Sequence, residues 1–460
     1  MKRAFTIIAS LIISLSSLCQ TLSLEQCKQL ALEHNKSLSS AKVQLEKSQF
    51  DMQSYKANFF PKIDLMAMDF YSNAKGDISI DGFQLPIKKL DLATGTYNYD
   101  VTILPDGSYV YNSYTDVPDI SREWKLKNIF MGGVSLMEPI YSGGKVSTAY
   151  NMSKLGVSIA KDNIRLSESE VVVNTEEAYI MAIKTKELGD VARRYQTLLQ
   201  ELKKNVDAAF RHGMSTRNDI MKVQVKLNEA ELSIQKADNA HRLALMNLCH
   251  IIGMPLDSQI EVDAECISTK EDSATGGSIE SRPEYAMLEK KTELARHNIK
   301  LTKSDYLPTV AAGASYTYAN GGEVGGKKLL NNGSFSVGMA VKVPLDVFGG
   351  GSNKVRSARA AYKIAQIEQQ DLNEKMQLEL SLCRNSLSES ALEVKLCESA
   401  LEHAAENVRL SKQQYEVGLE PLSEYLETQA VWQQAGASLV QARCQYMLAQ
   451  TKLRKASGVF

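Results

Sequence analysis

The sequence contains two copies of one half-protein, and this duplication constrains its fold more than any other feature. A shift of 205 residues maps each marker of the first copy onto the same or a similar residue of the second: Pro139 onto Pro344, Gly144 onto Gly349, Phe210 onto Tyr415, Gly213 onto Gly418, Asp219 onto Glu424 and Gly253 onto Gly458. An upstream pair, Asn58-Phe-Phe-Pro61 and Asp305-Tyr-Leu-Pro308, matches at a shift of 247. The first copy therefore carries an insertion of 42 residues, the difference between 247 and 205. A period this long indicates a duplicated half-protein rather than a solenoid.

The first 19 residues have the composition of an export signal. Lys2 and Arg3 precede an apolar run over residues 4–18, which fits a signal peptide and is short for a spanning helix. We assign residues 1–19 to a signal peptide and place the mature chain outside the cytoplasm. A lipid-anchored Cys19 stays an alternative, although Leu18 stands where such sites need a small residue.

The rest of the composition excludes several classes of function. The net charge is −1 and no basic stripe with interleaved aromatic residues occurs, so no nucleic-acid partner is expected. The histidines show no metal-ligand spacing, and no cofactor is predicted. The segment from Gly321 to Lys328 fits most of a phosphate-binding loop but ends in Lys328 where Ser or Thr should bind Mg²⁺. We read it as a short extracellular hairpin loop and expect no enzymatic activity.

The cysteines are predicted to be small buried residues rather than disulfides. Cys383 and Cys397 lie 14 residues apart in one predicted helix, about 21 Å along its axis, which a disulfide cannot bridge. A pairing of Cys27 with Cys249 or Cys266 stays open.

Two long segments without proline predict unusually long helices. Residues 354–417 contain neither Gly nor Pro over 64 residues, enough for a helix of about 96 Å. The first-copy counterpart, residues 145–212, has no Pro. Gly213 and Gly418 end these helices, and return helices are expected over residues 216–252 and 421–457. Such lengths imply coiled-coil or tubular packing.

Before each long helix the hydrophobic period changes from that of a helix to that of a strand. In the second copy, small or polar residues alternate with the apolar residues of two strands: Val310, Ala312, Ala314, Tyr316 and Tyr318, then Phe335, Val337, Met339, Val341 and Val343. This predicts a membrane-spanning hairpin over residues 309–343, with a soluble hairpin as the alternative. The first hairpin is expected over residues 62–138. Its insertion, residues 72–128, is rich in Gly, Asp, Asn and Tyr and is expected to form an extracellular loop.

These elements predict a mixed α and β membrane protein made of two repeats. The first repeat covers residues 20–253, a linker covers 254–282, and the second repeat covers 283–460. Each repeat has a helix, a β-hairpin, a long helix and a return helix. Four strands cannot close a membrane barrel, and an open sheet edge is not tolerated in lipid. The chain is therefore expected to oligomerise, and three copies would give a 12-stranded barrel.

The chain resembles the TolC family of outer-membrane efflux proteins along nearly all of its mature length. The resemblance rests on the order, spacing and duplication of a few short motifs. They are Asn58-Phe-Phe-Pro-Lys and Asp305-Tyr-Leu-Pro-Thr, then Glu138-Pro-Ile-Tyr-Ser-Gly-Gly and Val343-Pro-Leu-Asp-Val-Phe-Gly-Gly, and the turn Tyr415-Glu-Val-Gly-Leu-Glu-Pro-Leu-Ser-Glu-Tyr-Leu-Glu427.

The resemblance implies a homotrimer with a β-barrel in outer-membrane lipid and an α-helical tunnel in the periplasm. It implies a passive exit duct for efflux or type I secretion, gated at its periplasmic entrance. The implied partners are a periplasmic membrane-fusion adaptor and an inner-membrane efflux or secretion transporter. The alternative is a soluble periplasmic coiled-coil adaptor, which would explain the long helices but has no use for amphipathic strands. The sequence leaves the cargo open among drugs, metals, siderophores and proteins.

The resemblance also implies where the entrance lies. Family members carry acidic side chains at the start of the return helix, and the matching residues here are Glu424 and Glu427. Three residues apart, they share one helix face, and in a trimer they would form an acidic ring. The alternative is that both glutamates only complement the helix dipole.

Further residues associated with the gate follow from the same comparison. They are Tyr415, which matches a family tyrosine, Gly418 and Gly213 at the turns, and Asp219 and Lys222 in the first copy. Glu420 stands where a well-studied family member has arginine, so we expect it to pair instead with Arg217 or Lys222.

Overall fold

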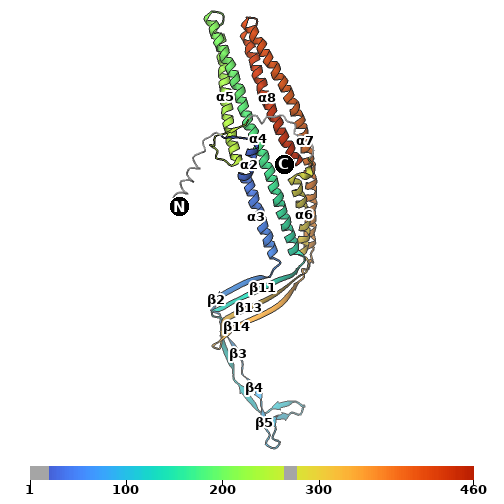
Figure 1. Ribbon diagram of the computed structural model, residues 1–460. Helices are drawn as coiled ribbons and strands as arrows, with labels where there is room; N and C mark the ends of the chain where they lie inside the picture. The colour runs from blue at the N-terminus through green and yellow to red at the C-terminus, as the bar shows by residue number, and fades with distance from the viewer. Residues whose placement is uncertain (1–19, 264–276, 460) are drawn as a thin grey trace, which may run out of the picture. The chain divides into compact units, whose positions relative to one another are not determined.

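The computed structural model describes residues 20–263 and 277–459. The chain divides into two compact units, and each unit draws on both copies of the repeat (Figure 1). A helical unit lies within residues 1–54, 147–302 and 352–460, and a β-sheet unit comprises residues 55–146 and 303–351. The predicted signal peptide and Cys266 lie outside the described residues.

The helical unit contains two pairs of long helices of matched length. Helices α4 (Lys145–Arg211) and α7 (Gly350–Glu416) have 67 residues each, and α5 (Arg217–Ile252) and α8 (Leu422–Ser457) have 36 each. At 1.5 Å per residue the longer pair extends about 100 Å. Helix α7 begins earlier than the sequence suggested, at Gly350 rather than at residue 354.

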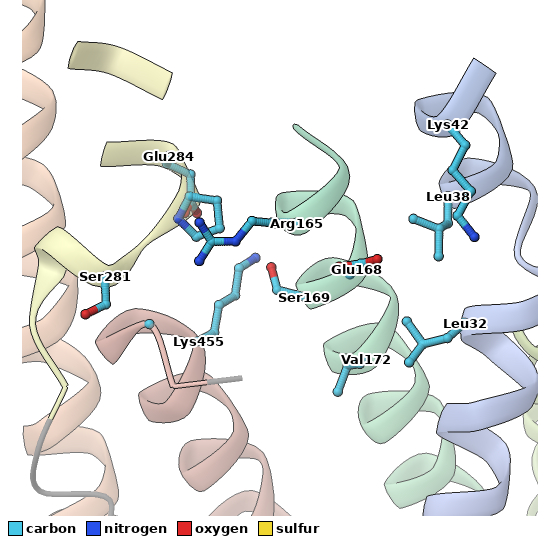
Figure 2. Close-up of a pocket in the computed structure, with 12 residues that line it drawn as sticks. Leu32, Leu38, Lys42, Arg165, Glu168, Ser169, Val172, Ser281, Glu284 and Lys455 are labelled. Atoms are coloured by element: carbon cyan, nitrogen blue, oxygen red, sulfur yellow. The ribbon is translucent and has the colours of Figure 1, made fainter. Parts of the chain in front are cut away.

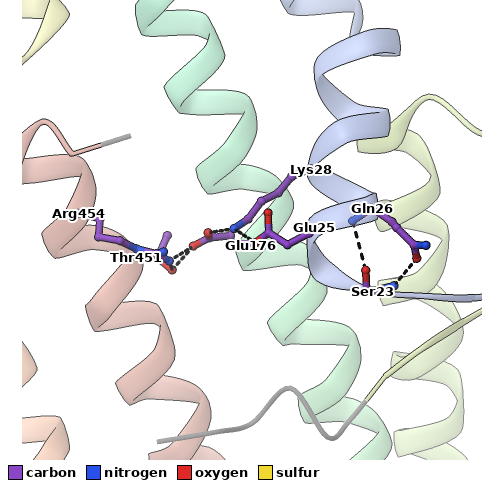
Figure 3. A network of polar contacts seen from close by, with 7 residues as sticks. All are labelled: Ser23, Glu25, Gln26, Lys28, Glu176, Thr451 and Arg454. Atoms are coloured by element: carbon purple, nitrogen blue, oxygen red, sulfur yellow. Dashed lines mark hydrogen bonds and ion pairs between the residues drawn. The ribbon is translucent and has the colours of Figure 1, made fainter. Parts of the chain in front are cut away.

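Shorter elements complete this unit. Helices α3 (Lys36–Ala57) and α6 (Pro283–Ser304) have 22 residues each, and a 3₁₀ turn, η2 (Ile279–Ser281), precedes α6. Helix α2 (Leu24–His34) begins with a capping box in which Ser23 and Gln26 exchange hydrogen bonds (Figure 3). Strands β1 (Gln20–Leu22) and β12 (Ile260–Val262) pair in parallel.

The apolar core of the helical unit is built around α4. Near its middle, Tyr179 and Ile183 are fully buried against α2, α5 and the β1–β12 pair. The hydroxyl of Tyr179 lies 3.0 Å from the carbonyl oxygen of Leu22 and accepts the N–H of Asp263 at 3.1 Å, so it ties the two short strands to α4. Toward its C-terminal end, α4 packs on α5 and α8 through a second cluster: Tyr195, Leu199, Leu202, Val206, Val223, Ala230, Leu422, Tyr425 and Leu426.

The cysteines with described structure are free thiols. Cys27, Cys249 and Cys444 are buried, as predicted, whereas Cys383 and Cys397 are only half-buried. Burial, together with the nearby Cys249, raises the pKa of Cys27 to about 11. These thiols therefore belong to the packing of the helices.

The β-sheet unit is organised around an antiparallel sheet with the order β2-β11-β13-β14. Its strands are β2 (Lys62–Phe70), β11 (Ile129–Ser142), β13 (Thr309–Val324) and β14 (Lys327–Lys342). Strand β11 continues past the expected end of the hairpin through a register shift between Pro139 and Tyr141. Proline has no N–H to donate to the ladder, which is why it sits at this irregularity.

The insertion of the first copy is not the loop that the sequence predicted. It forms the strand pairs β3 (Lys75–Ile80) with β10 (Ile120–Lys125), β4 (Phe83–Pro86) with β9 (Tyr114–Val117), β5 (Lys88–Leu90) with β6 (Tyr97–Tyr99), and β7 (Val101–Ile103) with β8 (Tyr109–Tyr111). The segment from Gly321 to Lys328 is likewise mostly strand, with a tight turn at Gly325 and Gly326, both at positive φ. It connects two strands and not a strand to a helix, as a phosphate-binding loop would.

Candidate functional site: the turns between the long helices

The two turns that join the long helices have the same backbone geometry. Gly213 and Gly418 adopt left-handed conformations, with φ of 75° and 78°. In the first copy the N–H of Met214 donates to the carbonyl of Ala209 at 2.8 Å, and in the second the N–H of Leu419 donates to the carbonyl of Gln414 at 2.9 Å. These bonds close a Schellman motif, which explains why both positions carry glycine.

The return helices begin in different ways in the two copies. In the first copy Thr216 and Asp219 form a capping box, and Asp219 also pairs with Lys222 at 3.3 Å. The hydrogen bond from Thr216, aided by Lys222, holds the pKa of Asp219 below its usual value of 3.8. Asp219 and Lys222 therefore bind each other at the start of α5.

In the second copy the corresponding acidic residues have no partner. Pro421 caps α8 without a side-chain hydrogen bond, because its side chain offers no acceptor. Glu424 and Glu427 are both exposed, and within the described parts of the chain neither side chain makes a hydrogen bond or an ion pair. Their carboxylates are therefore exposed and unpaired in the single chain.

Tyr415 packs against the start of the return helix. Its ring stacks on that of Tyr425 with the centroids 5.3 Å apart and the planes 19° from parallel. Burial, followed by the charge of Asp219, raises the pKa of Tyr415, so the phenol stays neutral. The stack ties the end of α7 to the first turn of α8, beside the cluster through which α4, α5 and α8 pack.

Glu420 does not form the ion pair that the sequence suggested. It accepts a hydrogen bond from the hydroxyl of Ser411 on α7, and Thr428 of α8 donates to the same hydroxyl at 3.1 Å. Lys222 is occupied by Asp219. The turn therefore binds its own two helices together rather than reaching across to α5.

A buried ionic network, which sequence reasoning missed, crosses the helical unit (Figure 3). The carboxylate of Glu176 on α4 is 1% exposed and lies 2.7 Å from the ammonium of Lys28 on α2. Its other oxygen lies 2.7 Å from the guanidinium of Arg454 on α8 and accepts a hydrogen bond from Thr451. One carboxylate thus joins three helices that are far apart in the sequence.

A hollow of about 430 Å³ lies beside α4 (Figure 2). Arg165 and Lys455 extend into it next to Ser169 (Figure 2). Lys42, Glu168 and Glu284 line the same hollow, so its lining has three cationic and two acidic side chains. Among the described residues, no group of three or more His, Cys, Asp or Glu side chains could hold a metal ion.

The comparisons with known proteins agree with this geometry. The family model described as "Outer membrane efflux protein" matches residues 277–459. The chain is 23% identical over 381 residues to the alkaline protease secretion protein AprF of Pseudomonas aeruginosa, covering 78% of this chain and 77% of that protein. It is 19% identical over 302 residues to the outer membrane protein TolC of Vibrio cholerae, covering 64% and 68%. The C-terminal part of the chain thus matches the outer membrane efflux protein family, and the predicted resemblance is confirmed.

The fold of the chain is that of solved outer-membrane channels. The Campylobacter jejuni CmeC channel superimposes with a TM-score of 0.74 at 17% identity, covering 95% of this chain and 86% of the other. The predicted location is confirmed as the outer membrane with a periplasmic extension. The family whose model matches and the solved structures that share this fold are outer-membrane channel proteins and not enzymes. Of the helices that the structure describes, none combines the length and hydropathy needed to cross a membrane.

Proposed function

We propose that three copies of the chain close a 12-stranded barrel in the outer membrane. The observation that carries the proposal is the two-sided character of the sheet. One face is apolar and open to solvent in the single chain, with Leu65 81%, Phe335 70% and Val337 71% exposed. The opposite face carries a row of polar residues that pair across all four strands: Asp64, Ser135, Ser315 and Ser336. Such a sheet suits lipid on one side and water on the other.

The edges of the sheet require other copies. Among the residues that the structure describes, strand β2 pairs only with β11 and β14 only with β13, so each presents an unpaired row of backbone groups. In lipid these groups must be satisfied by another chain. Two copies would give eight strands, whose interior is just wide enough for side chains, whereas three give twelve and leave room for a channel.

We further propose that this channel is the passive exit duct of an efflux or secretion system. Energy would come from an inner-membrane transporter, reached through a periplasmic adaptor. The relatives support both uses, since AprF is named as a secretion protein and the family as efflux proteins. The free carboxylates of Glu424 and Glu427 would form the selective ring at the periplasmic entrance, six in a trimer of two each. A ring of carboxylates favours cations.

Single-channel conductance in planar bilayers tests both parts of the proposal. Wild-type trimers are expected to conduct with cation selectivity, and the Glu424→Gln/Glu427→Gln variant to lose that selectivity. Glu402→Gln is the matched control, because Glu402 is an exposed residue of α7 away from the turn. Conductance with unchanged selectivity in the double variant would refute the ring and keep the duct. Failure of a folded sample to insert would refute the barrel.

A further inference from the structure

Strands β3 and β10, here called the ribbon, have one apolar and one polar face. Ile80 pairs with Ile120 and Ile78 with Arg122, whereas Ser79 pairs with Ser121 and Asp77 with Glu123. Because neighbouring residues of a strand point to opposite faces, the isoleucines share one face and the serines and acids the other. Ile78, Ile80 and Ile120 are 53%, 55% and 44% exposed.

The single chain leaves this apolar face uncovered. No apolar side chain of residues 72–128 is buried, and Ser113 is the one buried residue of that segment. A two-stranded ribbon alone is marginally stable in water. Something outside the single chain must therefore cover the isoleucines.

The ribbon also lies along the edge where the next copy must join. Strand β14 occupies one side of β13 along its whole length, and β11 and then β10 share the other side. Beyond these two, β3 follows β2 at the same edge. In the proposed trimer a neighbour's β14 lies along this edge, but β14 has 16 residues and β2 only nine. The next strand available to the surplus residues of β14 is β3.

The charges at the two ends are complementary. Asp77 stands directly opposite Glu123, a like-charge pair that is unfavourable across strands, and Asp77 has no partner in the described chain. The first residues of β14 are Lys327 and Lys328, followed by Leu329, which is 59% exposed. Because neighbouring residues of a strand point to opposite faces, a neighbouring β14 offers Lys328 to the polar face and Lys327 and Leu329 to the face of the isoleucines.

We propose that the ribbon binds the start of β14 of a second copy of this chain, so that the insertion forms an interface outside the barrel. The inference rests on the proposed trimer and adds a contact that barrel closure does not require. In it, Lys328 of the neighbouring copy compensates Asp77, and Leu329 of that copy covers Ile78.

Cross-linking between differently tagged copies tests the contact. Chains carrying Ile78→Cys are co-expressed with chains carrying Leu329→Cys, and the purified trimers are treated with a short bifunctional maleimide. Covalent dimers containing both tags can arise only between copies. The control pairs Ser79→Cys with Leu329→Cys, because residue 79 lies on the opposite face. Tagged chains without new cysteines measure the background from the native thiols.

We expect two-tag dimers well above the Ser79→Cys control. We also expect Asp77→Lys and Lys328→Asp each to lower the dissociation temperature of the trimer, and the double variant to restore it. Trimers that conduct but give no two-tag dimers above control would overturn the contact while keeping the barrel. Protection of Ile78→Cys from labelling only in lipid nanodiscs would assign the face to lipid and also overturn it. Absence of trimers would refute the barrel and this interface together.

Discussion

Removing the charge of Glu176 is expected to release α2 and α8 from α4. Breaking a buried ion pair by deleting one partner costs about 3–5 kcal/mol, because the remaining charge stays buried without compensation. The side chains of Lys28 and Arg454 are 14% and 29% exposed, so both retain some water. For Glu176→Gln we therefore expect the lower end of that range, about 3 kcal/mol.

Hydrogen exchange measures this loss locally, without requiring the whole protein to unfold reversibly. A loss of about 3 kcal/mol corresponds to a roughly hundredfold faster exchange of amides that open with the network. The effect should appear in α2 and in the last turns of α8, next to Thr451 and Arg454. Glu170→Gln serves as the control, since Glu170 is an exposed residue of the same helix.

A second variant distinguishes the loss of attraction between Lys28 and Glu176 from the cost of leaving the charge of Lys28 buried without a partner. If the cost arises because Lys28 is left buried without its partner, Lys28→Met should recover part of the protection lost in Glu176→Gln. Unchanged exchange in α2 and α8 of Glu176→Gln, or an equal effect of Glu170→Gln, would refute the assignment of the network as a tie between the helices.

Three further predictions concern the network and the turns. Burial alone would lower the pKa of Lys28, but its contacts with Glu176 and Glu25 raise this pKa above 10.5. The contribution of Lys28 to stability should therefore persist below pH 10.5 and fall as pH rises through the folded pKa. Lys28→Met should lose this alkaline dependence of amide exchange in α2. Asp219→Ala removes the capping box and should destabilise the first turn of α5 by about 1 kcal/mol, as measured by amide exchange. Glu424→Ala should leave amide exchange in the first turn of α8 unchanged. Because the pKa of Asp219 lies below 3.8, its contribution should be lost as pH falls through the folded pKa. Gly418→Ala should lower the free energy of unfolding by about 1 kcal/mol, because φ of residue 418 is 78° although no atom crowds the added carbon. Melting curves followed by circular dichroism should show a smaller loss for Gly418→Asn.

The long helices could be predicted because their ends have strong local signals. Gly213 and Gly418 carry the left-handed turns, and no proline interrupts the segments before them. The strands around Tyr316 and Phe335 could also be predicted, since alternation of apolar and small residues is a local pattern.

The features that the sequence did not predict depend on partners far along the chain. Glu176 lies among apolar and small residues of a helix, and nothing local distinguishes it from an exposed glutamate. Glu420 was predicted to pair with a cationic side chain because a carboxylate attracts positive charge. In the structure the hydroxyl of Ser411 is its hydrogen-bond partner instead. The insertion was predicted to be a loop because of its Gly, Asp, Asn and Tyr content. Pairing between β3 and β10 joins residues 40 to 50 positions apart, which no local window detects.

The matched lengths of the helices restrict how such a protein can evolve. Helices α4 and α7 have the same number of residues, and so do their return helices. Deleting one heptad from α4 alone would withdraw its turn by about 10 Å relative to that of α7. Changes in the length of these helices are therefore expected to arise as paired insertions or deletions in both halves of the gene. One heptad is the smallest step that preserves the packed face of each helix.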